Sequence, residues 1–278
     1  MTGNTLGWVI VAFVLYLLMM IAIGAFYAKG NNNSEDYFLG GRKLNGFVAA
    51  LSAQASDMSG WLLMGLPGAI YLTGVGGDGW IAIGLFIGTT LNWLFIATKL
   101  RRYTIHANNS VTLPTYFENR FHDEKKVLMT VSSITIVVFF LVYCASALSA
   151  GGQLFESVFG IDYHVALTIG ALVVLVYTFL GGFTAVCVTD FIQGMLMLVG
   201  ILAVPLFAYH FLTGNGTTLA AGLEASGADS ANFLNLMKNG DGSNNIISVI
   251  SGLGWGLGYF GMPHILVRFM AVRDEKEM

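Results

Sequence analysis

Long apolar runs separated by short polar segments form the dominant pattern of this sequence. A helix of about 20 residues crosses the hydrocarbon core of a bilayer, and most of the runs reach or approach that length. The pattern therefore predicts an all-α polytopic membrane protein. The predicted spans, about seven in number, cover residues 6–28, 46–73, 80–98, 127–155, 163–180, 191–212 and 246–263.

The segments between these runs carry turn and cap signals. The sequence GVGGDG at residues 74–79 predicts a glycine-rich turn. In TLPTYFENRF, Thr112 is placed as a helix cap and Pro114 as an early helical residue, so this segment predicts a short surface helix. Residues 213–243 are rich in Gly, Asn and Ser and predict a long loop.

Composition supports the membrane assignment and argues against a nucleic-acid partner, a metal site formed by histidines and a cofactor. Of the 278 residues, 55% are hydrophobic and 10% charged, with a mean hydropathy of +0.71, whereas soluble domains have about 25% charged residues. The net charge is −3 and no basic patch occurs outside the loops, so we expect no nucleic-acid partner. Cys144 and Cys187 fall in apolar runs and predict reduced core residues. The scattered histidines lack metal-ligand spacing, and no cofactor is indicated.

The distribution of Lys and Arg predicts the orientation of the spans. With the N-terminus outside, only Lys238 of the 13 Lys and Arg residues lies on the outer side. Positively charged loops stay in the cytoplasm, so this orientation is strongly favoured. The opening MTGNT has no Lys or Arg, which argues against a signal peptide. We expect a multi-pass protein of the cell (plasma) membrane.

The second span contains features that a simple hydrophobic anchor does not need. Asp57 lies in its middle, beside a Ser59-Gly60 step. A carboxylate in hydrocarbon costs about 2.5 kcal/mol or more on insertion scales, so it should face a cavity, a partner or a bound cation. Gly and Ser beside it weaken the helix and favour a discontinuous transporter helix. The structural alternative is a carboxylate satisfied by helix-end amides or by Arg42.

Three further positions have alternative interpretations. Arg42 lies on the cytoplasmic side and suits gating, pairing with an acid, or setting of topology. Asp190 precedes the sixth span and is either a helix cap or a transport residue. The sequence GLGYFG at residues 256–261 matches GxGxxG, but no strand precedes it, so it does not indicate a nucleotide-binding enzyme.

Five motifs carry a resemblance to a known family. They are ALSAQASDMSGWLLMGLPGAIYL, VTLPTYFENRF, FFLVYCASALSAGGQLFES, YTFLGGFTAVCVTDFIQ and GWGLGYFGMPHILVRFMA. In that order they resemble the sodium/solute symporter family and, within it, the branch that transports proline. The resemblance implies a LeuT-like inverted-repeat transporter fold, with two repeats of five helices after one extra helix. Spans two and seven would open the two repeats, and both are interrupted by glycines, as expected around a midplane site.

The chain ends shortly after the seventh span. We therefore expect residues 1–278 to be the N-terminal part of one transmembrane transporter domain, with an incomplete second repeat. The resemblance implies that some sodium ligands belong to a later helix outside this sequence.

The resemblance also implies which residues bind the ion and the solute. Sodium binding or coupling is expected at Ala55, Asp57, Met58 and Ser59, with backbone carbonyls of Ala55 and Met58 as ligands. Substrate binding is expected at Gly60, Trp61, Tyr143, Trp255, Tyr259 and Pro263. The last three are spaced by four residues, which places them on one face if the seventh span is an α-helix.

Together these observations predict a transporter and not an enzyme. We expect sodium-coupled symport of a small amino acid, with L-proline favoured and Na+ as the coupling ion. Two alternatives remain at this point. One is a symporter of the same family for pantothenate or a sugar, and the other is a transporter-like membrane module of a sensor protein.

Overall fold

A computed structural model describes residues 3–278, and in that range the chain forms helices and no sheet. The α-helices are α1 (Gly3–Ala28), α2 (Ser34–Leu39), α3 (Gly46–Asp57), α4 (Leu66–Thr73), α5 (Val75–Asn92), α6 (Thr98–His106), α7 (Leu113–Phe121), α8 (Val127–Phe159), α9 (Tyr163–Gly214), α10 (Leu219–Ala225), α11 (Ser230–Phe233), α12 (Ile246–Gly254) and α13 (Pro263–Ala271). Shorter 3-10 and π segments occupy residues 40–42, 61–65, 93–97, 255–261 and 275–277.

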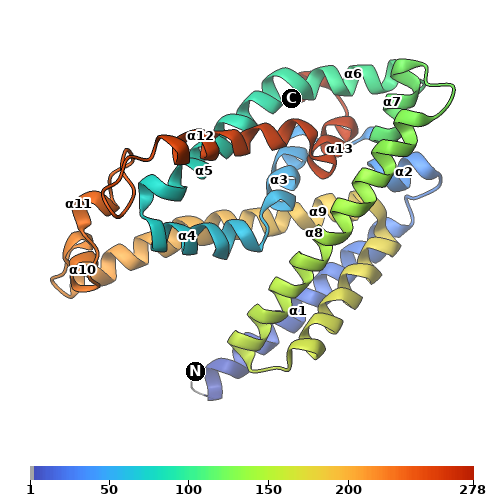
Figure 1. Ribbon diagram of the computed structural model, residues 1–278. Helices are drawn as coiled ribbons and strands as arrows, with labels where there is room; N and C mark the ends of the chain where they lie inside the picture. The colour runs from blue at the N-terminus through green and yellow to red at the C-terminus, as the bar shows by residue number, and fades with distance from the viewer. Residues whose placement is uncertain (1–2) are drawn as a thin grey trace.

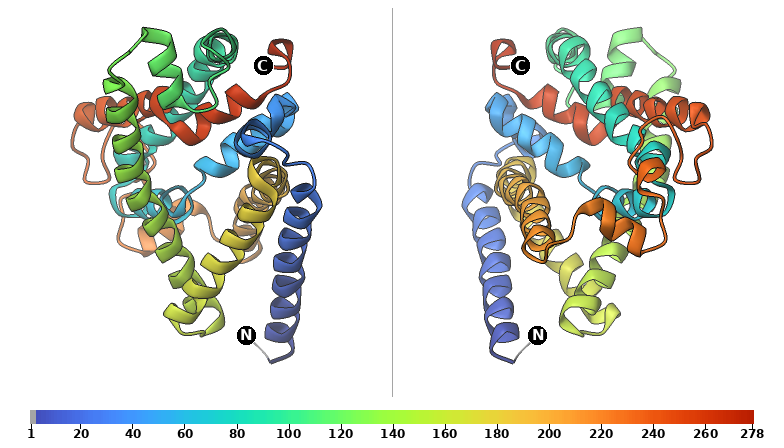
Figure 2. Two further views of the ribbon diagram at one scale, coloured as in Figure 1. Left: turned by 90° about the vertical axis from the view of Figure 1, so that its right-hand side faces the viewer. Right: turned by 90° about the vertical axis from the view of Figure 1, so that its left-hand side faces the viewer.

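The long helices pack in two groups joined through α3 (Figure 1). In one group α1 and α8 lie against α9, and in the other α12 lies along α5. Helix α3 crosses α9 and also contacts α13, which follows α12 in the chain. It therefore connects the groups. Figure 2 shows α1, α8 and the first part of α9 projecting together to one end of the molecule, beside the N-terminus.

Helix α9 is a single assigned element of 52 residues that contains two of the predicted spans. Its backbone leaves helical geometry at Gly182, where φ is 60° and ψ is −157°, and the ribbon changes direction between its yellow and gold parts (Figure 1). A Cβ atom at this position would also lie 2.9 Å from the Tyr37 carbonyl oxygen. Only glycine fits such a turn without strain.

Both spans that were predicted to be interrupted are broken in the structure. Helix α3 ends at Asp57, Met58 has a ψ of 88°, and a π-helical turn follows before α4. Helix α12 continues as a 3-10 helix over Trp255–Gly261, Met262 is extended, and α13 then departs at 47°. Proline at the start of α13 suits this second break, because the first turn of a helix needs no amide donor there.

The polar connections differ in part from the prediction. The predicted surface helix is confirmed as α7, with Thr112 as its cap and Pro114 in its first turn. The predicted turn at residues 74–79 is wrong beyond Gly74, because α5 already begins at Val75. The glycines there permit close packing, since a Cβ at Gly76 would lie 1.9 Å from the Lys238 carbonyl oxygen. The predicted loop at 213–243 contains α10 and α11.

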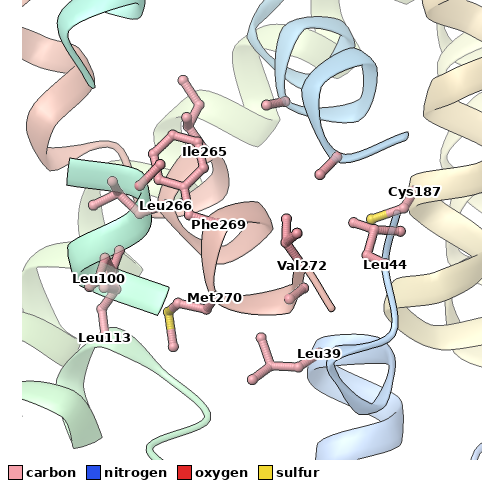
Figure 3. Close-up of a cluster of buried hydrophobic side chains, with 14 of the residues drawn as sticks. Leu39, Leu44, Leu100, Leu113, Cys187, Ile265, Leu266, Phe269, Met270 and Val272 are labelled. Carbon is pink, nitrogen blue, oxygen red and sulfur yellow. The ribbon is translucent and has the colours of Figure 1, made fainter. Parts of the chain in front are cut away.

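The main buried cluster lies around α13 (Figure 3). Phe269, Met270 and Val272 are fully buried among side chains from α2, α3, α6 and α7. By contrast, the long helices expose large apolar side chains such as Phe139 and Phe179, at 69% and 77%. Lipid can cover such a surface, whereas continuous apolar faces of this extent are rare on soluble proteins.

Four helices within residues 3–278 are long and apolar enough to cross a membrane, or five if the bent α12–α13 pair is one span. One of the four is α9, whose length and turn at Gly182 provide for two crossings. The chain is therefore a multi-pass membrane protein.

Candidate functional site

The breaks of the two interrupted helices meet through a side-chain hydrogen bond. Asp57 is the last residue of α3, and its Oδ2 accepts a hydrogen bond from the hydroxyl of Tyr259 in the 3-10 segment. Tyr259 is only 4% exposed. Among residues 3–278, no Lys or Arg forms an ion pair with Asp57, so the structure rejects the alternative that Arg42 satisfies it.

A small cavity lies beside this hydrogen bond, between α3, α5 and the 3-10 segment. Its volume is about 10 Å³, and its polar lining is provided by Gln54, Asp57, Thr89, Asn92 and Tyr259. Asn92 is 1% exposed and donates from Nδ2 to the Tyr259 carbonyl oxygen at 2.9 Å. Sequence reasoning missed Asn92, although an amide inside an apolar span is a signal that could have identified it.

Asp190 is the centre of a second polar cluster. Its Oδ2 accepts hydrogen bonds from Arg268 Nη2 at 2.9 Å and from the hydroxyls of Ser52 and Ser56 at 2.7 and 3.1 Å. Asp190 and Arg268 are both buried, at 8% and 5% exposure. The cluster therefore connects α9, α13 and α3.

The interpretation of Asp190 as a helix cap is wrong. The helical stretch that contains it begins after Gly182, so Asp190 lies inside the helix and its carboxylate bonds to other elements. Arg268 was not predicted as a site residue, and its position late in the chain gives no local signal of this pairing.

Aromatic side chains surround the two breaks on the other sides. The indoles of Trp61 and Trp255 are stacked, with centroids 5.6 Å apart and planes at 12°. The Tyr143 hydroxyl donates to the Ser56 carbonyl oxygen at 3.3 Å, and its ring stacks on His264 at 5.7 Å. The tryptophan stack joins the two interrupted spans, and the Tyr143 contacts join α8 to the end of α3 and to α13.

The predicted common face of Trp255, Tyr259 and Pro263 is wrong. Trp255 is 46% exposed while Tyr259 is buried, because the segment is a 3-10 helix with about three residues per turn. Pro263 lies beyond the extended Met262 and lines an apolar groove beside α7 and α8. Spacing by four residues indicates a shared face only in an α-helix.

The remaining predicted residues lie around the break in span two. Ala55 is buried within α3, and Met58 and Ser59 form the break itself and are half-buried. A Cβ at Gly60 would approach the Ala150 side chain to 2.8 Å, so glycine allows α8 to pack closely here. The structure thus places Ala55, Met58, Ser59 and Gly60 next to Asp57 along one short stretch of chain.

Arg42 lies away from these contacts and pairs with an acid. Its guanidinium lies 3.3 Å from Glu35 and donates to the carbonyl oxygens of Met270 and Ser110, each at 2.8 Å. Burial lowers the pKa of this guanidinium, and the neighbouring positive charge of Arg101 lowers it further, while Glu35 raises it. The side chain therefore fastens the segment before α3 to α13 and to the loop before α7.

Comparisons with known proteins agree with this architecture. Residues 37–278 match the sequence profile of the Sodium:solute symporter family. The Sodium/proline symporter of Escherichia coli is 47% identical over 262 residues, which are 94% of this chain and 50% of that protein. The High-affinity proline transporter PutP of Bacillus subtilis is 48% identical over 259 residues, which are 93% and 53%. The chain thus spans about half the length of these relatives.

A solved structure shows the same fold. The substrate-bound outward-open state of a Na+-coupled sialic acid symporter superposes with a TM-score of 0.75 and 20% sequence identity. The match covers 94% of this chain and 54% of that chain. It confirms the LeuT-like transporter fold, of which this chain contains an incomplete set of helices.

Proposed function

The chain belongs to the Sodium:solute symporter family, and on that basis we propose that it provides the first repeat and the start of the second repeat of a sodium-coupled symporter for L-proline. The relatives named above are proline transporters at 47% and 48% identity. The single observation that carries the proposal is the position of Asp57. Its carboxylate lies at a helix break, next to the break of the second interrupted helix, and accepts its hydrogen bond from a neutral hydroxyl.

In this proposal sodium binds at the break in span two. The carbonyl groups of Ala55 and Met58 and the hydroxyl of Ser59 supply oxygen ligands, because unwound backbone in transporters can coordinate a cation. Asp57 offsets the charge of the ion. A bound cation would hold the two breaks together through the Asp57–Tyr259 hydrogen bond.

The solute binds between the same two breaks. Trp61, Trp255, Tyr143 and Tyr259 surround this region and suit a small ring, while the backbone amides at the helix break near Gly60 suit a carboxylate. Pro263 lines the groove beside α7 and is not part of the proposed solute site. Alternating access then follows from rocking of one helix group against the other.

We place the protein in the plasma membrane with its N-terminus outside. The support is the distribution of Lys and Arg, which leaves only Lys238 on the outer side. A cysteine-accessibility experiment with impermeant reagents at Lys238→Cys and Lys125→Cys tests this orientation, because only the first is expected to react from outside.

The function is tested by uptake of labelled proline into proteoliposomes that contain the complete protein. An inward sodium gradient should drive accumulation, and a potassium gradient should not. Asp57→Ala should reduce uptake to the level of protein-free liposomes, whereas Asp78→Ala, an acid at the start of α5, should not. Sodium-driven uptake of labelled pantothenate or of a labelled sugar, without uptake of labelled proline, would assign another solute, and sodium-independent uptake would reject coupling.

A further inference from the structure

The cavity beside Asp57 has an uncompensated buried acceptor. Asn92 is 1% exposed, and its Oδ1 has no hydrogen-bond partner among the described residues. The orientation of this amide follows from chemistry, because the other amide atom faces the Tyr259 carbonyl oxygen at 2.9 Å and must be the donor Nδ2. Buried polar atoms in native proteins are almost always satisfied, so this oxygen requires a donor or a cation.

The other polar groups of the cavity also favour a positive occupant. Asp57 contributes a carboxylate, and Thr89 and Tyr259 contribute hydroxyl oxygens. None of the described residues that line the cavity is basic. With a volume of about 10 Å³, the cavity has room for one ion or one water molecule and excludes larger ligands.

We propose that this cavity is a cation seat, in which one Na+ is held by Asp57 and by the side-chain oxygens of Asn92 and Thr89. The seat is distinct from the backbone carbonyls of Ala55 and Met58 and lies on the α5 side of the same carboxylate. It rests on the proposed sodium coupling and adds ligands from span three. Oxygen atoms of this kind replace the hydration shell of an alkali cation.

The position of the seat connects the ion to the solute region. Asn92 bonds to the backbone of Tyr259, whose hydroxyl bonds to Asp57. A cation between Asn92 and Asp57 therefore draws α5, α3 and the 3-10 segment together. A cation bound in the seat holds Tyr259 in place. Without the cation, Asp57 keeps the hydrogen bond from the neutral hydroxyl of Tyr259.

The test measures binding of Na+ alone, without proline, to the purified complete protein. Thermal protection is followed as NaCl replaces KCl at constant ionic strength. Asn92→Leu removes the oxygen at similar volume, and Thr89→Val removes a hydroxyl isosterically. We expect the Na+ concentration for half-maximal protection to rise by about tenfold or more in Asn92→Leu, which corresponds to the loss of one good ligand.

The matched control is Thr90→Val, because the Thr90 hydroxyl is satisfied by the Phe86 carbonyl oxygen of its own helix at 2.8 Å. Thr90→Val should leave the Na+ dependence unchanged, whereas Thr89→Val should weaken it. If Asn92→Leu fails to fold, Thr89→Val decides the question. An unchanged Na+ dependence in the folded variants would mean that the cavity holds only water and would overturn the seat.

The result of the Na+ protection test can be distinguished from the result of the proline uptake test. Failure of the wild-type protein to accumulate proline under a sodium gradient rejects the function, but Na+ protection in the absence of proline still reports on the seat. Conversely, normal sodium-driven uptake combined with unaltered Na+ dependence in the Asn92 and Thr89 variants retains the function and rejects the seat.

Discussion

The carboxylates of Asp57 and Asp190 both accept hydrogen bonds from other helical elements, and their surroundings differ. Asp190 is bound by the guanidinium of Arg268 and by two serine hydroxyls. Asp57 accepts from the hydroxyl of Tyr259 and lies beside a cavity. Among residues 3–278, a basic side chain pairs with Asp190 and none pairs with Asp57.

The difference separates a structural role from a binding role. A buried charge needs a partner of opposite sign or a neutralising environment. Asp190 has that partner in Arg268, so its cluster fastens α9 to α13 and α3. Asp57 has no such partner among residues 3–278, and we propose that a mobile cation compensates its charge and later leaves. The region around Asp57 is thus suited to exchange, and the region around Asp190 to holding helices together.

The largest expected effect is on the Asp190 cluster. Asp190→Ala leaves Arg268 buried without its charge partner, which should cost about 3–5 kcal/mol in the free energy of unfolding. Equilibrium unfolding of the complete protein in mixed micelles measures this loss. Because the cluster is proposed to be structural, the loss should be equal in NaCl and KCl. A loss below about 1 kcal/mol, the range of exposed pairs, would contradict the distinction.

A smaller effect is expected around Asp57. Tyr259→Phe removes the hydroxyl donor while keeping the ring, and a hydrogen bond to a charged group is worth about 1.5–3 kcal/mol. The loss of unfolding free energy should appear in KCl and be smaller in NaCl, since Na+ can replace the missing donor. Asp190→Ala measured in both salts is the control. An equal loss for Tyr259→Phe in both salts would mean that no cation compensates Asp57.

The smallest effect concerns an exposed ion pair between α6 and the 3-10 turn at residues 275–277. Arg102 Nη2 lies 2.6 Å from Glu275, and hydrogen bonds from Arg102 hold the pKa of this carboxyl below its ordinary value of 4.5. A lowered pKa in the folded state gives stability that is present above pH 4.5 and is lost as the pH falls below it. The wild-type protein should therefore be slightly more stable than the Glu275→Gln variant at pH 7, and the two should be equally stable at low pH.

Unfolding midpoints measured at several pH values check this expectation. Salt should screen the difference at pH 7, because both side chains are accessible to solvent. A difference in unfolding midpoint between the wild type and Glu275→Gln that increases as the pH falls would have the wrong sign and would contradict the assigned pair.

Local sequence signals predicted much of this architecture. The break at Met58 and Ser59 follows from a polar, flexible stretch inside an apolar run, and the cap of α7 follows from Thr112 and Pro114. Such signals act within a few residues. The spans themselves also follow from apolar runs, except that the glycine segment after Gly74 became helical because α5 packs closely against the chain near Lys238.

Features that depend on distant contacts were not predictable. Asp190 and Arg268 are far apart in the sequence, and no local pattern pairs them. Trp255 and Tyr259 face different directions because their segment is a 3-10 helix. This segment packs against α5. An amide in an apolar run marks Asn92 only as unusual, and its candidacy as a ligand depends on its burial against Tyr259, which leaves Oδ1 without a partner among residues 3–278. In each case the deciding contact involves another helix.

The turn at Gly182 makes the fold sensitive to the number of residues between Gly182 and Asp190. No loop separates the two arms of α9, so the turn sets the rotational phase of every residue that follows. An α-helix advances by about 100° per residue. A single inserted residue just after Gly182 would therefore swing Asp190 a quarter-turn away from Arg268. Homologous proteins that preserve this ion pair should tolerate many substitutions in the second arm of α9 but no insertion or deletion between the glycine and the aspartate.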